Sequence, residues 1–305
     1  MAEFPCIEDL NQPLVISYET NLETNDNSLM FKKTLDDLGW KYVFVGEGCK
    51  WNGFKSKIFG YTNYLKTLPQ EKIIILSDAR DVFACRSPHI FKNVINDIVN
   101  IKNKFIVSAE LFLIGHINWT EEEIAKKKSI DSNYFWQGET LTNYWKYIGM
   151  SDNLPKRKYV NSGLMIGKAR QLLDAFEWFI ENNFTDDQLG LAKYINTFPN
   201  KVHLDTDAKY LHTCTMCVSS GYYDSEFQNY DSVTVSELLG MSSYFLHIPG
   251  LNMSKGQNKL YYTIKKNISD ELIKPFMILN EYSDCKDYVN KSSDYFPKLE
   301  NYVSK

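Results

Sequence analysis

Apolar residues recur along the first half of the chain in two patterns that alternate. Short apolar runs, which are typical of buried strands, occur at residues 14–18, 42–45, 72–76 and 105–107. The segments between them, 28–38, 54–68 and 88–99, carry apolar side chains at helical spacing, and Gly39 and Pro69 end the first two. This order of strands and helices predicts an α/β fold that is Rossmann-like, with a mostly parallel central sheet flanked by helices.

The alternation stops after Glu110 and resumes near residue 160. The segment between contains Trp119, Trp136 and Trp145 and a charged run at 121–128, and we interpret it as an excursion from the sheet. It forms either a surface subdomain with its own aromatic cluster or a wall or lid over an acceptor site. Beyond it we expect a strand at 164–166, a helix at 170–181, a helix start at 186–188, and strands at 202–204 and 244–247.

The length of the chain suits one large α/β domain with an appended tail. We assign residues 1–256 to that domain, with 111–158 as a variable excursion. Residues 257–305 then form a C-terminal helix near 272–280 and a polar tail.

Charge and composition narrow the functional classes. The net charge of −4 leaves no broad basic face for a nucleic-acid backbone, so we expect no nucleic-acid partner. We also expect no membrane span, because no apolar run approaches the required ~20 residues. The first 12 residues lack the basic and apolar regions of a signal peptide. This favours a cytoplasmic setting, in a host cell or a virion if the chain is viral, over the secretory lumen.

The cysteines of the chain are too few and too scattered for a disulfide scaffold. Cys214 and Cys217 form a lone CxxC motif, with His203 and His212 nearby in the sequence. This fits two separate thiols, one local disulfide or a structural zinc site, and all three stay open.

Two carboxylates three positions apart follow the most apolar strand. Asp78 and Asp81 come directly after residues 72–76, and ligands bind at the carboxyl ends of strands in open parallel sheets. Mg²⁺ and Mn²⁺ take oxygen ligands and bridge to substrate phosphates. The pattern therefore indicates a divalent-cation site. A helix cap, or a surface turn in which an acid pairs with Arg80, would use the same residues.

His247 ends the last expected strand and is followed by a loop rich in glycine and proline. In that loop Gly250 lets backbone N–H groups approach an anion, and Lys255 supplies a positive charge. Neutral imidazole can also be a third ligand beside Asp78 and Asp81. The alternative is a core histidine followed by an ordinary turn.

A helix start at Asp186, Asp187 and Gln188 is the third candidate. Thr185 can cap this helix, and acids in its first turn suit the helix dipole, so a structural role is sufficient. The functional interpretation is a carboxylate and an amide aimed at a sugar, with an aspartate stabilising positive charge at the anomeric carbon.

The segment that begins at Trp51 is the fourth candidate. An aromatic ring, a glycine turn and two lysines, of which Lys57 is the second, suit a cover over a nucleotide. A solvated helix start would have the same composition.

The order of these motifs resembles that in the glycosyltransferase domain at the N-terminus of the multifunctional collagen lysyl hydroxylases, and in its stand-alone viral relatives. The resemblance spans roughly residues 14–256. The matching stretches are LVISYETN, WNGFKSK, IIILSDARDVF, FIVSAE, YVNSGLMIG, DDQLG, VHLDTDAKYL and FLHIPGLNMSK.

The resemblance implies a GT-A fold and transfer of glucose from UDP-glucose to galactosyl-hydroxylysine of collagen or a collagen-like protein, with retention at the anomeric carbon. It implies Mn²⁺, with Mg²⁺ as the alternative, held by Asp78, Asp81 and His247. Asp186 and Asp187, with Gln188, match the acidic motif needed for transfer. The residues that match the donor site are Thr20, Trp51, Lys57, Arg80, Asn161, Gly163, Gly250 and Lys255.

The chain departs from the family pattern where the base and the acceptor bind. Arg80 stands where the family often has an aromatic residue that stacks on uracil, and a guanidinium can also stack. After Glu110, residues 111–113 replace the usual Cys-Trp pair, and 111–158 is longer than expected. The alternatives are a UDP-galactose or UDP-GlcNAc transferase acting on hydroxylysine or another glycan, a nucleotide-sugar hydrolase, and a non-catalytic glycan- or collagen-binding module.

Overall fold

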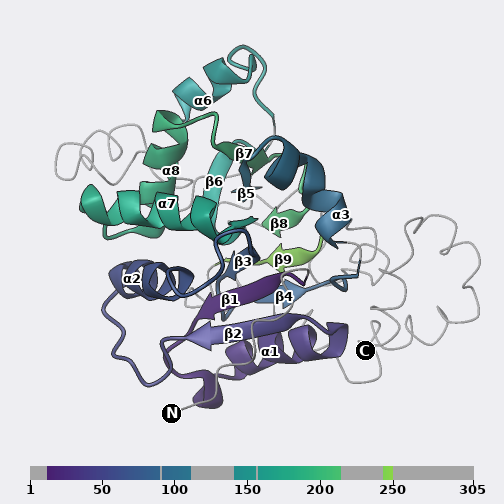
Figure 1. Ribbon diagram of the computed structural model, residues 1–305, viewed down its shortest axis with the longest axis vertical. Helices are drawn as coiled ribbons and strands as arrows, with labels where there is room; N and C mark the ends of the chain where they lie inside the picture. Colours follow the sequence, from purple (N-terminus) through teal and green to yellow (C-terminus); the bar gives the residue numbers. More distant parts are fainter. Residues whose placement is uncertain (1–11, 90, 111–140, 156, 214–242, 250–305) are drawn as a thin grey trace, which may run out of the picture.

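The computed structural model describes residues 12–89, 91–110, 141–155, 157–213 and 243–249. In this part of the chain a nine-stranded sheet runs through the centre of the molecule in the order β2-β1-β3-β6-β5-β8-β9-β4, and β7 also pairs with β5 (Figure 1). The strands are β1 (Leu14–Tyr18), β2 (Lys41–Val45), β3 (Ile73–Ser77), β4 (Val82–Ala84), β5 (Phe105–Glu110), β6 (Tyr159–Lys168), β7 (Val202–Asp205), β8 (Leu211–Thr213) and β9 (Phe245–His247).

Helices cover both faces of the sheet (Figure 1). They are α1 (Asp26–Leu38), α2 (Phe54–Leu65), α3 (Phe91–Asn96), a π-helical continuation (Asp97–Ile101), α6 (Thr142–Tyr147), α7 (Ala169–Glu181) and α8 (Asp187–Thr197), with a 3-10 turn at Leu22–Thr24. None of the described helices is long and apolar enough to cross a membrane.

Successive residues of the central strands pack into two separate hydrophobic cores. In β3, Ile74 and Leu76 pack with α2, α6, α7 and α8, whereas Ile73 and Ile75 pack with α1 and α3. All four side chains are buried, which explains why this strand reads as a continuous apolar run. The predicted architecture, a mostly parallel sheet flanked by helices, is therefore confirmed.

The exceptions to parallel pairing bring the site together. β6 runs antiparallel to β3 and β5, and β4 runs antiparallel to β9. Antiparallel pairing places the first half of β6 beside the carboxyl end of β3, where Ser77 lies opposite Leu164. Residues before Leu164 therefore reach the same edge of the sheet as Asp78.

Most expected elements are present, with shifted ends. The helix expected at 54–68 ends at Leu65, and the one expected at 88–99 begins at Phe91. β4 and β8 were not predicted, because three residues carry too little pattern. Most of 111–158, the boundary at 256, the helix expected at 272–280, and Cys214 and Cys217 lie outside the described residues.

Candidate functional site

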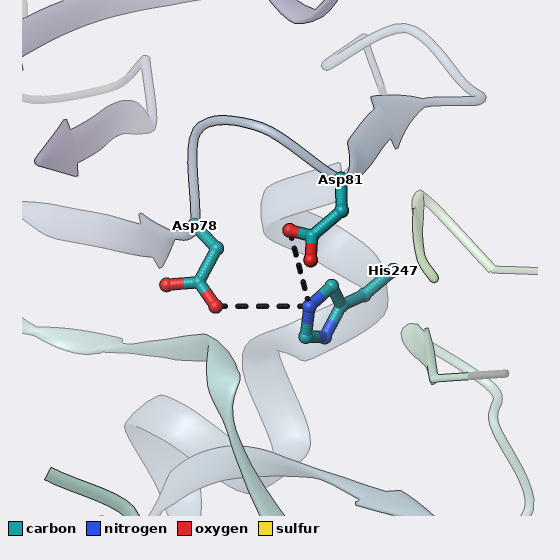
Figure 2. A group of neighbouring side chains, drawn as sticks. All are labelled: Asp78, Asp81 and His247. Carbon is teal, nitrogen blue, oxygen red and sulfur yellow. Dashed lines mark ion pairs between the residues drawn. The ribbon is translucent and has the colours of Figure 1, made fainter. Parts of the chain in front are cut away.

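Asp78, Asp81 and His247 meet at the edge of the sheet (Figure 2). Asp78 follows β3, Asp81 precedes β4, and His247 ends β9, where it lies opposite Val82. The Nε2 atom of His247 is 3.6 Å from Asp78 Oδ2 and 3.4 Å from Asp81 Oδ1. One potential ligand atom from each residue lies within 4.8 Å of the others. The structure thus has the convergence that the sequence predicted.

Backbone hydrogen bonds fix both ends of the turn that carries the two acids. The amide of Asp78 donates to the carbonyl of Gly163 at 2.8 Å, and the amide of Ile248 donates to the carbonyl of Asp81 at 2.8 Å. The first bond ties the turn to β6 and the second to the residue after His247. The separation of the three side chains is therefore set by the sheet.

Gly163 leaves the space that the imidazole fills. A Cβ atom at this position would lie 2.2 Å from His247 Cε1 and 2.9 Å from Asp78 Oδ2. Any side chain would displace one of the two groups. The backbone approaches the site closely here, which explains the glycine of the Asn-Ser-Gly motif. From the sequence, this motif was predicted to line the site of the sugar donor.

The donor set at this edge fits a divalent cation. The ring of His247 is buried, its Nδ1 lies 3.0 Å from Asn161 Oδ1, and its Nε2 has no hydrogen-bond partner in the described part of the chain. Burial would lower the pKa of His247, but the negative charges of Asp81 and Asp78 raise it above its ordinary value. A cation between the three groups would take the place of that proton. Two carboxylates and an imidazole nitrogen suit Mn²⁺ or Mg²⁺.

Lys57 is buried between two acids. Its ammonium group pairs with Asp78 Oδ1 and lies 2.7 Å from Asp187 Oδ2. Burial would lower the pKa of Lys57, but Asp187 and Asp78 raise it well above its ordinary value. The lysine predicted to cover a nucleotide therefore neutralises a candidate metal ligand and an acid of α8.

The acidic motif of α8 divides into two environments. Asp186, not Thr185, is the N-cap: its Oδ1 accepts from the amide of Leu189 at 2.8 Å. Asp186 is half-buried, whereas Asp187 is buried. Burial raises the pKa of Asp187 even though Lys57 opposes this effect. The capping role is therefore real, and it does not exclude a catalytic one.

Gln188 connects α8 to the sheet. Its Oε1 accepts from the amide of Ser162 at 3.3 Å, and its Nε2 donates to Glu110 Oε1 at 3.4 Å. Glu110 is fully buried at the end of β5, and its Oε2 accepts from Asn161 Nδ2 at 3.3 Å. Glu110 was not among the site residues predicted from the sequence. The available signal was its place at the carboxyl end of a strand, which is where Asp78 also lies.

Glu19 is a second buried acid that was missed. Arg80 donates to it from Nε and Nη2, each at 2.8 Å, and Ser28 Oγ donates at 2.6 Å. The amide of Thr20, one of the predicted donor residues, also donates to it at 2.8 Å. Burial would raise the pKa of Glu19, but the hydrogen bonds from Arg80, Ser28 and the Asn21 amide outweigh burial and bring it to about 2.

The two hydrogen bonds to Glu19 fix the orientation of the planar Arg80 guanidinium, and the Arg80 side chain remains 41% exposed. Trp51 is 47% exposed, and its ring centroid lies 5.9 Å from that of Tyr18 and 5.9 Å from that of Phe54. Both predicted base-contacting groups thus present a flat surface to solvent. Gly250 and Lys255 lie outside the described residues.

Comparisons with known proteins give distant similarities. No protein-family model matches the chain. It is similar to the uncharacterized protein R699 of Acanthamoeba polyphaga mimivirus, with 23% identity over 216 residues that cover 68% of this chain and 40% of that protein. Among solved structures it is similar to a glycosyltransferase involved in the glycosylation of the major capsid of PBCV-1, with a TM-score of 0.43 and 10% identity over 82% of this chain and 99% of that one. The function therefore has to be argued from the site.

Proposed function

We propose that this protein is a metal-dependent glycosyltransferase of the GT-A type that moves a hexose from a UDP-sugar to a hydroxyl group. The observation that carries the proposal is the meeting of Asp78, Asp81 and the unpartnered Nε2 of His247 at the edge of the sheet. The motif order supports UDP-glucose as the donor and galactosyl-hydroxylysine of collagen or a collagen-like protein as the acceptor.

Asp78, Asp81 and His247 would hold Mn²⁺, or Mg²⁺, beside the diphosphate of the donor. The bound cation stabilises the negative charge of a departing diphosphate. Lys57 lies behind this site, where its positive charge pairs with the carboxylates of Asp78 and Asp187 and favours their ionised forms.

Of the two acids in the α8 motif, we assign Asp186 to the sugar. It is half-buried at the start of the helix, whereas Asp187 is buried against Lys57. A carboxylate at this place steadies the positive charge that develops at the anomeric carbon, and Gln188 lines the same side. The acceptor hydroxyl attacks the face from which the diphosphate departs and passes its proton to that diphosphate, which gives retention.

Trp51 and Arg80 are assigned to the nucleobase. An indole ring stacks on a base through its face, and a guanidinium held flat by Glu19 does the same with a positive charge. Arg80 thus takes the place of the aromatic residue that related sequences carry.

A donor panel tests the proposal. UDP release is measured with UDP-glucose, UDP-galactose and UDP-GlcNAc, with and without Mn²⁺, and with and without a galactosyl-hydroxylysine peptide. We expect Mn²⁺-dependent, acceptor-dependent release that is fastest with UDP-glucose.

Asp81→Asn should lower the rate of UDP release by more than about 100-fold, since changes behind metal ligands already cost about 10- to 100-fold. Asp97→Asn, which removes an exposed pair with Lys102, should leave the rate unchanged.

Each other outcome selects a different function. Release that is equally fast without acceptor indicates a nucleotide-sugar hydrolase. A faster rate with another donor or acceptor glycan changes the substrate and keeps the reaction class. Binding of glycan or collagen peptide without any UDP release, in the presence of Mn²⁺, would refute the enzyme assignment in favour of a binding module.

A further inference from the structure

A buried row of polar side chains leads from His247 back into the sheet. The Nδ1 atom of His247 lies 3.0 Å from Asn161 Oδ1. On its other side, Asn161 Nδ2 donates to Glu110 Oε2 at 3.3 Å, and Gln188 Nε2 donates to Glu110 Oε1 at 3.4 Å. His247, Asn161 and Glu110 are all buried, so bulk water does not replace these contacts.

One hydrogen-bond donor and one acceptor fix the orientation of the Asn161 amide. The backbone amide of Gly163, which can only donate, lies 2.8 Å from Asn161 Oδ1. The carboxylate of Glu110 accepts on the opposite side, where it faces Nδ2. The amide oxygen therefore faces His247, and the amide nitrogen faces away from it.

This orientation decides which imidazole nitrogen carries the proton. An oxygen that faces Nδ1 is satisfied only when Nδ1 carries hydrogen and donates. A neutral imidazole has one N–H, so its lone pair is then on Nε2, the atom that faces Asp78 and Asp81. The reversed amide would place two hydrogens toward Nδ1, move the ring proton to Nε2 and block cation binding.

We propose that Asn161, oriented by Glu110, is a positioning residue that keeps His247 in the form that binds a cation through Nε2. This inference rests on the metal site of the proposed function. Neither side chain needs to touch the cation or the substrate. Hydrogen bonds from groups behind a metal-binding histidine fix its tautomer and ring orientation, and their loss costs about 10- to 100-fold in metal affinity.

The first test compares Mn²⁺ binding by Asn161→Ala with binding by a matched variant, Ser108→Ala. Ser108 Oγ donates to the backbone carbonyl of Asn161 at 3.1 Å, so Ser108→Ala removes a buried hydrogen bond to the same residue and leaves the imidazole contact intact. Titration calorimetry of the full chain, with and without UDP, should show about 10- to 100-fold weaker Mn²⁺ binding for Asn161→Ala. Ser108→Ala should bind Mn²⁺ as the wild type does.

The second test exchanges the amide and the carboxylate. In Glu110→Gln alone, one oxygen has to serve the amide nitrogens of both Asn161 and Gln188, so the hold on the Asn161 amide weakens, its reversal becomes easier, and Mn²⁺ binding should weaken. In the double variant Glu110→Gln, Asn161→Asp, the new amide donates to the new carboxylate, which still accepts from His247 Nδ1. The double variant should recover most of the wild-type affinity, even if Asn161→Ala does not fold.

A spectroscopic readout separates positioning from a general structural effect. In metal-free protein, at a pH above the raised pKa of His247 so that the ring is neutral, ¹⁵N shifts of the His247 ring, assigned with His247→Ala, should show Nδ1–H in the wild type and the double variant. Glu110→Gln should shift the ring toward Nε2–H.

Equal Mn²⁺ affinity for wild type and folded Asn161→Ala would overturn the inference. So would equal losses in Asn161→Ala and Ser108→Ala, or no recovery in the double variant. A wild type that binds no Mn²⁺, with or without UDP, would instead overturn the metal site, and with it the proposed function.

Discussion

At the scale of single residues, the charge of Lys57 has the largest structural consequence. It lies between Asp78, whose side chain is partly exposed, and the buried Asp187, which come from different elements and would otherwise face each other as two anions. One ammonium group thus pairs with a candidate metal ligand and with the second acid in the α8 motif. The sequence around it indicated either a cover over a nucleotide or a solvated helix start.

Replacing Lys57 with methionine should lower the stability of the metal-free protein strongly. Lys57→Met keeps most of the side-chain volume and leaves the buried Asp187 carboxylate, and the partly exposed one of Asp78, without their cation. We expect the free energy of unfolding, measured by urea denaturation near neutral pH, to fall by about 3–5 kcal/mol.

Lys32→Met is the matched control. Lys32 lies 2.9 Å from Asp36 in an exposed pair on α1, and such a pair contributes about 0.3–0.5 kcal/mol. Similar small losses in both variants would show that Lys57 does not hold the two acids in place.

At the scale of elements, the sequence predicted what local pattern encodes. The apolar runs at 14–18 and 72–76 gave β1 and β3, and the left-handed Gly39 ends α1 as expected. Pattern does not encode strand direction, so the antiparallel β6, which carries Asn161 and Gly163 to the site, was expected as a short strand of no stated direction. The α8 cap moved by one residue, because both Thr185 and Asp186 are good capping residues.

The two roles assigned to Asp186 can be separated by two substitutions. Asp186→Asn keeps a side-chain oxygen for the Leu189 amide and removes the charge, so stability should be retained while UDP release falls. Asp186→Ala removes both, and should also lose about 1 kcal/mol of unfolding free energy. Urea denaturation and UDP release report the two effects. Wild-type turnover by Asp186→Asn would show that the reaction does not use this charge.

At the scale of the whole molecule, one edge of the sheet gathers buried and partly buried acids from distant segments. They are Glu19 directly after β1, Glu110 at the end of β5, Asp78 in the turn after β3, and Asp187 in α8, and each has a cationic or hydrogen-bonding partner. The sequence allows each acid to be placed at the end of a strand or at the start of a helix. Which partner it meets could not be predicted, because partners such as Lys57 and Arg80 are supplied by tertiary pairing.

This arrangement predicts how stability depends on pH. The pKa of Glu19 is about 2 in the folded chain and 4.5 ordinarily, so the folded state gains from its charge above the ordinary pKa. That contribution disappears as pH falls from about 4.5 to about 2. Because Arg80 is partly solvated, we expect Glu19→Gln to lower the unfolding free energy by about 2 kcal/mol near pH 7.

The deficit of Glu19→Gln relative to wild type should then shrink steadily as urea unfolding is repeated at more acidic pH. Glu177→Gln, which removes an exposed partner of Lys66, should show almost no deficit at any pH. A deficit of constant size across this range would contradict the ion pair as its source.

The glycine at position 163 gives a criterion for distinguishing homologues that can form this site from those that cannot. The volume that a Cβ would need is already taken by the His247 ring and the Asp78 carboxylate. A homologue that carries alanine or anything larger there cannot keep both groups in place. From this one position of its sequence, we expect such a homologue to lack the proposed cation site and to keep only the fold.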